Sequence, residues 1–284
     1  QAVRSLGEVF FYGLSNAPPA LQLYQQATQQ DPIWSGGTST IYAAVGDREA
    51  SARWLEPHRK NFPDEAWGVF EALNAMRRSG DAEGIAALAA EALQISRDVL
   101  PPSFPMGALQ AQYLAEGRTD DLLRMYSEHY PELLYEDPDV NLANIDAAVN
   151  LISIHRAMMD EPAAQQLAEL ILKDSKFREG IDLYGPVVYA AKVHAIYGRT
   201  EEAVAEISRL IDAGRVFFDA DLYFGGDEWA GLRADPAFQA LLDINSRKIE
   251  EQRSRIRQLE EEGKIARFPE ELSSITIDVS SLIE

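Results

Sequence analysis

The residue types that could act in catalysis or hold a metal are few in this 284-residue chain. Its four histidines show no pair on one helical face, the arrangement that a zinc site on a helix would need. His155 and His194 stand where helical repeats carry a large packed residue, so packing is the favoured interpretation of both. The run Gly36 to Thr40 lacks the lysine of a phosphate-binding loop and predicts the start of a helix instead.

Two acidic loops carry carboxylates that could act as ligands. Glu136 to Asp139 lacks the ligand spacing and turn glycine of a calcium loop, and Gly225 to Glu228 is interpreted as a turn and helix cap. The chain has no cysteine, which excludes thiolate catalysis and disulfides. Because no nucleophile, base and metal set converges, we expect no enzymatic activity, no cofactor and no metal. An unrecognised helical enzyme stays open as a third class of function.

Charge and composition narrow the class of partner. The formal net charge of −20 repels phosphate backbones, so no nucleic acid is expected. No apolar run approaches the roughly 18–20 residues that span a bilayer, so no direct membrane insertion is expected. The chain begins at Gln1 rather than at methionine, which predicts a processed or excised fragment. The compartment stays open between bacterial cytoplasm and periplasm, including the soluble part of a membrane-anchored protein.

A repeated pattern runs through the chain: a helix with a large residue near its end, a turn glycine, and an amphipathic helix that contains alanine. The turn positions, 34, 37, 42 and 39 residues apart, are Gly46, Gly80, Gly117, Met159 and Gly198. Glycine ends a helix by adopting a positive φ. Pro32, Pro63 and Pro131 close second helices, because proline cannot continue one.

This pattern resembles the tetratricopeptide repeat (TPR), whose period is about 34 residues. A further N-terminal copy fills the small, aromatic, alanine and proline positions of that repeat with Ala20, Tyr24, Ala27 and Pro32. The resemblance implies an all-α fold, a right-handed α-solenoid of five to six TPR-like helical hairpins over residues 1–215. Each pair would need its neighbours to cover its apolar face. Generic helical hairpins are the alternative for the stretched middle copies.

Residues 216–263 are predicted to form a capping loop and a long charged helix. Asp235 is a good N-cap, and Pro236 a good first-turn residue, for a helix that runs to about Glu262. One phrase resembles the end of the TPR region in bacterial multidomain regulatory proteins: Asp227, Leu232, Arg233, Asp235, Pro236, Phe238, Leu241 and Leu242. That resemblance implies a module of a bacterial regulatory system, and it covers no regulatory domain.

The long helix and the tail after it could hold two copies together. Polar Asn245 and Gln252 interrupt an apolar seam at heptad spacing, whose candidate oligomer residues are Leu242, Ile249, Ile256 and Leu259. The helix is therefore either a cap on the last repeat or a short coiled coil that forms a homodimer. In the tail, residues 264–284, Ile275, Ile277 and Val279 alternate with polar residues, which predicts an extended, strand-like segment.

The repeat register also predicts which side chains face the concave groove of the solenoid, where an extended peptide would bind. They are Thr40, Trp67, Phe70, Asn74, Arg77, Ser153, Arg156 and Lys192. The basic residues among them would bind carboxylates. The sequence therefore predicts a non-enzymatic scaffold for a protein or peptide, a signalling or membrane-associated module, with self-association through the C-terminal helix and tail as the alternative.

Overall fold

The computed structural model describes residues 2–63, 65–94, 101–173, 181–182, 185–186 and 189–277. Over these residues the chain is helical apart from a two-residue antiparallel ladder, so the predicted all-α class is confirmed. The elements are α1 (Ala2–Glu8), η1 (Val9–Gly13), α2 (Ala17–Gln30), η2 (Pro32–Trp34), α3 (Ser35–Ala44), α4 (Arg48–Asn61), α5 (Ala66–Ser79), α6 (Ala82–Ala92), α7 (Ser103–Ala115), α8 (Thr119–His129), η3 (Pro131–Leu134), α9 (Ile145–Ala157), α10 (Glu161–Lys173), β1 (Ile181–Asp182), β2 (Gly185–Pro186), α12 (Tyr189–Ile196), α13 (Thr200–Asp212), α14 (Ala220–Tyr223), η4 (Asp227–Trp229), α15 (Ala230–Arg233), α16 (Pro236–Glu261) and η5 (Pro269–Ser274).

Helices follow one another as antiparallel pairs, α3 with α4, α5 with α6, α7 with α8, α9 with α10 and α12 with α13. Every turn between the two helices of a pair holds a residue with positive φ, and these are the five predicted turn positions: Gly46, Gly80, Gly117, Met159 and Gly198. Met159 adopts this conformation without being glycine, at a φ of 61°, and its side chain is almost fully exposed. The predicted turn chemistry is therefore confirmed at each pair.

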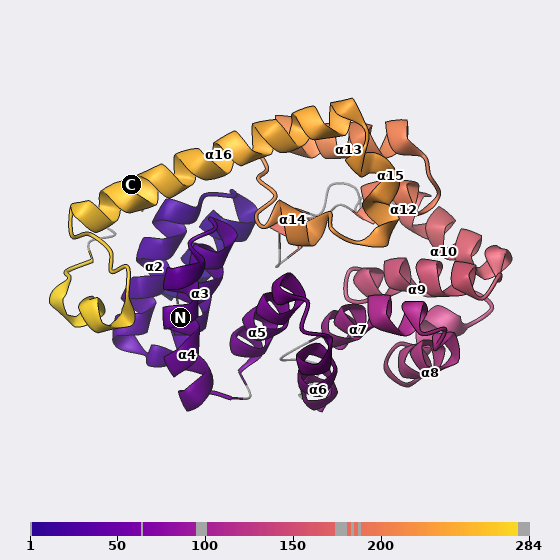
Figure 1. The fold of residues 1–284 in the computed structure, drawn as a ribbon, viewed down its shortest axis with the longest axis horizontal. Helices are drawn as coiled ribbons and strands as arrows, with labels where there is room; N and C mark the ends of the chain where they lie inside the picture. Colours follow the sequence, from indigo (N-terminus) through magenta and orange to yellow (C-terminus); the bar gives the residue numbers. More distant parts are fainter. Residues whose placement is uncertain are drawn as a thin grey trace.

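Successive pairs pack on one another through their first helices. α3 contacts α5, α5 contacts α7, α7 contacts α9, and α9 contacts α12. Ala50 and Ala203, two of the small residues in the repeated pattern, have no exposed surface, which is what close helix approach requires. Figure 1 shows the pairs following one another along an arc, with α5 and α9 toward its middle and α6 and α8 toward its outside.

The two ends of this arc are joined by α16. Asp235 caps the helix by accepting hydrogen bonds from the backbone N–H groups of Ala237 and Phe238, at 2.9 and 3.0 Å, and Pro236 opens its first turn, as predicted. The helix begins beside α13 and α15 and ends beside α2. In Figure 1 it runs in gold across the top of the molecule, from the orange helices to the indigo ones. It is thus more than a cap on the last pair.

The described part of the tail, up to Ile277, is folded back on the N-terminal helices α2, α3 and α4. It turns at Gly263, which has a φ of 66°, and it contains the short helix η5 rather than a strand. Ile265, Ala266, Leu272 and Ile277 are buried in one apolar core with side chains of α2, α3 and α4. Ile275 has extended backbone angles and is half-buried, Thr276 is exposed and Ile277 is buried, so the predicted alternation is seen here without a paired strand, while Val279 lies outside the described residues. Burial on a helical surface, and not pairing with a strand, explains the apolar residues here.

Candidate functional site

Lys192 of α12 contacts Asn150 of α9 and Glu228 of η4, and Arg77 of α5 and Asp146 of α9 lie within electrostatic range of this group. We call this set the inner cluster, and its members are Arg77, Asp146, Asn150, Lys192 and Glu228. Asp146 and Asn150 are one helical turn apart and so share a face of α9. The residues come from widely separated parts of the sequence, and packing of the first helices brings them together.

Lys192 is the centre of this cluster. Its Nζ donates to Asn150 Oδ1 at 3.1 Å and lies 3.3 Å from Glu228 Oε1. The backbone carbonyl of Asn150 accepts a hydrogen bond from Gln110 of α7 at 3.3 Å, which fixes the neighbouring helix. Adding a Cβ at Gly107 would place it 3.2 Å from Asn150 Nδ2, so the small residue leaves room for this amide. Lysine, amide and carboxylate groups together offer both donors and acceptors to a ligand.

Arg77 lies at the edge of the same cluster. Its side chain is exposed, yet desolvation by the surrounding protein lowers the pKa of its guanidinium, while the carboxylates of Glu228, Asp146 and Asp219 act in the opposite direction. The exposed Arg77 guanidinium can bind an anionic or carbonyl group.

Arg78, the next residue, joins α5 to the turn before α14. Its Nε donates to Asp219 Oδ2 at 2.7 Å, and its Nη2 lies 4.0 Å from Glu71 Oε2. Glu71 is buried, and desolvation raises the pKa of its carboxyl to about 7, with Arg78 opposing the shift. Asp219 itself has a φ of 56°, unusual for a residue other than glycine. This contact links α5 to the C-terminal quarter of the chain.

The other predicted groove residues fall into different environments. Thr40 is buried and its hydroxyl donates to Gly36 O at 3.1 Å, so it is not presented to a ligand. Phe70 stacks on Phe104 with ring centroids 4.3 Å apart. Asn74 is buried and Ser153 half-buried. The side chain of Trp67 lies outside the described residues.

Arg156 is separated from the inner cluster. Its guanidinium donates to the carbonyl of Ile196, lies 3.5 Å from Glu161, and covers the ring of Tyr197 at 4.8 Å. These partners are in or beside the hairpin turns, so Arg156 joins two pairs of helices. The repeat register predicts that Arg156 lies with Arg77 and Lys192. The register does not specify in which direction along the helix a long side chain extends, so it could not distinguish Arg156 from the other two.

The predicted oligomer seam is largely occupied within the chain itself. Ile256 and Leu259 are buried in the core formed with α2, α3 and α4, and Leu242 packs partly buried on the core around α13. Ile249 between them is half-buried. Ile256 and Leu259 are therefore not available to a second copy, and their assignment as oligomer residues is corrected. The apolar residues at heptad spacing pack on two cores in succession along α16, first the core around α13 and then the core formed with α2, α3 and α4.

The polar residues of that seam bind backbone groups. Asn245 accepts from Phe217 N at 2.7 Å and donates to Phe217 O at 2.9 Å. Gln252 accepts from Ala17 N at 2.6 Å and donates to Ser15 O at 2.8 Å. Both amides therefore fix α16 on segments that are distant in sequence, a role that the sequence analysis missed. The signal was present, since two amides interrupt an otherwise apolar seam.

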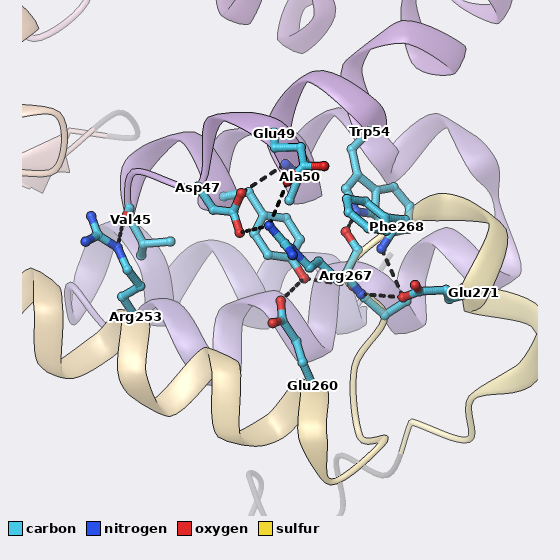
Figure 2. Close-up of polar contacts among 12 residues, drawn as sticks. Val45, Asp47, Glu49, Ala50, Trp54, Arg253, Glu260, Arg267, Phe268 and Glu271 are labelled. Atoms are coloured by element: carbon cyan, nitrogen blue, oxygen red, sulfur yellow. Dashed lines mark hydrogen bonds and ion pairs between the residues drawn. The ribbon is translucent and has the colours of Figure 1, made fainter.

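A dense set of polar contacts surrounds the end of α16 and the tail (Figure 2). Arg267 lies 3.3 Å from Asp47 and 3.0 Å from Glu49. The Tyr42 hydroxyl lies 2.8 Å from Ala266 O and 3.0 Å from Glu260 Oε1. Burial raises the pKa of the Glu260 carboxyl, and the same cause raises that of Tyr42.

The described residues contain no group of three histidine, aspartate or glutamate side chains that could hold a metal ion. Of the helices in that part of the chain, none is long and apolar enough to cross a bilayer. Comparisons of the chain with protein-family models, with curated proteins and with solved structures gave no match. The site is therefore interpreted from its own geometry.

Proposed function

We propose that this protein is a non-enzymatic scaffold, a solenoid of TPR-type helical hairpins whose inner cluster binds an extended segment of a partner protein. The observation that carries the proposal is the convergence of Arg77, Asn150 and Lys192 from three first helices, α5, α9 and α12. Repeat proteins use such a surface for binding because each repeat contributes one or two side chains to it. The resemblance of residues 227–242 to regulatory proteins suggests a module of a bacterial regulatory system.

The chemistry of the cluster favours a segment with carboxylate and backbone carbonyl groups. Guanidinium and ammonium donors bind carboxylates with charge-assisted hydrogen bonds, and the Asn150 amide offers a donor and an acceptor to a peptide bond. Glu228 at present neutralises Lys192. A ligand carboxylate would take the place of Glu228 at the lysine, while the net charge of −20 disfavours strongly acidic ligands at long range.

Three charge reversals test the proposal on an array of extended peptides of graded net charge. Arg77→Glu and Lys192→Glu should each weaken binding of the captured peptides at least about tenfold, or about 1.4 kcal/mol. Arg156→Glu is the matched control, because it makes the same charge change outside the inner cluster. Equal binding by all three variants and the wild type would rule out the inner cluster as the binding surface.

A further inference from the structure

Side chains of α2 and α4 hold the tail segment, residues 265–277, mainly through hydrogen bonds to its backbone. Gln25 of α2 donates to Ala266 O at 2.5 Å and accepts from Ala266 N at 2.7 Å. Trp54 of α4 donates from Nε1 to Arg267 O at 2.9 Å. Gln29 of α2 reaches the carbonyls of Leu272 and Ile275 at 3.0 and 2.9 Å. Such side-chain contacts to main-chain groups are how proteins bind extended peptides of modest sequence specificity.

Specificity comes from small apolar sites between these contacts. Ile265 and Ala266 are 1% and 0% exposed, and Leu272 and Ile277 are buried further along. Ala266 has no exposed surface, so a larger side chain there would have to displace buried neighbours. At the rim, Arg267 lies beside Asp47 and Glu49, as Figure 2 shows, and Arg53 pairs with Glu270. The surface therefore selects an apolar residue, a small residue and a base in succession.

The tail segment is connected to α16 in a way that allows it to leave. Residues 261–264 are exposed, and Gly263 sits in the left-handed region with a φ of 66° and open space around it. Release of the segment would therefore require rotation at this turn and no change in α16. A tethered segment competes with a free one at an effective concentration of roughly millimolar.

We propose that α2, α3 and α4 form a peptide-binding surface that the chain's own tail segment occupies, and that a partner protein binds there by presenting an extended apolar–small–basic segment like Ile265 to Arg267. This surface is separate from the inner cluster, and the proposal does not depend on it. The tail is then an intramolecular ligand, and a partner must compete with it to bind the surface.

The test supplies the tail in trans to the full chain. Ala266→Asp should prevent the tail from seating, because a carboxylate would enter a fully buried position. A fluorescent peptide of residues 262–277 should then bind the Ala266→Asp chain, by anisotropy, at least tenfold more tightly than it binds the wild type. The same peptide carrying Ala266→Asp is the matched control and should not bind. Adding Gln25→Ala to the variant chain should weaken binding at least tenfold.

A folded Ala266→Asp chain that does not bind the peptide, or that binds the control peptide equally well, would overturn the proposal. If the variant does not fold by circular dichroism, the wild type is cleaved at a protease site inserted between Gly263 and Lys264. Uptake of the labelled peptide in exchange for the cleaved tail supports the proposal, and failure of that exchange overturns it. A wild-type dimer in sedimentation that Ala266→Asp abolishes would assign the segment to a second copy and overturn the partner assignment.

Discussion

The N-terminal and middle parts of the molecule bury their apolar side chains in different ways. The core around α2, α3 and α4 takes its buried members from residues 11–54 and from residues 256–277, the two ends of the described chain. The core around α9 takes its members from residues 106–193, which are consecutive helices. The first core exists only when the chain has closed on itself, whereas the second needs only neighbouring helices.

The difference extends to hydrogen bonds. At the closed end, Gln25, Gln252 and Arg253 each bond a backbone group more than 200 residues away. Around α9, the comparable contact from Gln110 to Asn150 spans 40 residues. Contacts between distant residues cost more chain entropy to form than contacts between neighbours. The middle part should therefore form early and independently, and the closed end should form late and open first.

The largest effect is expected from a charge placed in the closing core. Ile256→Asp puts a carboxylate among buried apolar side chains of α2 and α3, which should cost about 3–5 kcal/mol in urea unfolding. Hydrogen exchange should accelerate in α2 and in the tail and stay slow in α9. Ser254→Asp adds the same charge at an exposed position of the same helix and is the control. Equal acceleration in α9 would erase the distinction between the two parts.

A cavity in the core around α9 tests the same comparison by destabilising the middle part of the molecule instead of the closed end. Ile152 is fully buried in α9, so Ile152→Ala should cost about 2–5 kcal/mol. Because that core is built from consecutive helices, faster hydrogen exchange is expected in α7 to α10 while α2 keeps its protection. Ser153→Ala, at the half-buried next position, should change little. Loss of protection in α2 would mean that the two cores unfold as one.

The contact of α5 with Asp219 makes a pH-dependent prediction. The pKa of Glu71 is raised from 4.5 to about 7, so the folded state favours the protonated carboxyl. The protonated Glu71 carboxyl therefore makes its full contribution to stability below about pH 4.5, and that contribution is lost as pH rises through 7. Glu71→Gln, which stays neutral, should match the wild type near pH 4.5 and exceed its free energy of unfolding by up to about 3 kcal/mol at pH 8. Parallel stability curves from pH 4.5 to 8 would contradict this.

The smallest effects are expected at the hairpin turns. Met159→Gly relieves a left-handed conformation at an exposed residue and should stabilise the protein by about 1 kcal/mol. Gly198→Ala introduces the same strain where nothing else crowds the new methyl group, and should destabilise by a similar amount. Thermal unfolding of both variants measures the pair of opposite shifts. Shifts of the same sign would show that φ does not control these turns.

The turns and helix caps could be predicted from the sequence, whereas the packing of α16 and the tail on the N-terminal helices could not. The turns at Gly46 and Gly198 and the cap at Asp235 follow from the conformational limits of a few adjacent residues, and all three were predicted. Of the inner cluster, Arg77 and Lys192 were found because they share a place in the repeat. The long-range contacts were missed because no sequence periodicity records them.

Gln252 illustrates the missing information. In the sequence it is a polar interruption of an apolar seam, which indicates weak self-association. In the structure its amide bonds Ser15 O and Ala17 N, a backbone pair that no side-chain pattern announces. Glu228 was likewise interpreted as part of a turn and cap, although its carboxylate lies beside Lys192. In both cases the partner lies in a distant segment, so the role is visible only in three dimensions.

The length of α16 has a consequence for how this architecture can evolve. Its 26 residues span about 39 Å, and that distance must match the separation between α13 and α2, which it touches at either end. Open repeat arrays gain or lose units readily, because each unit contacts only its neighbours. Here an added or deleted hairpin would change the separation and leave the helix too short or too long. Duplication of a unit should therefore be tolerated only together with a change in the length of α16.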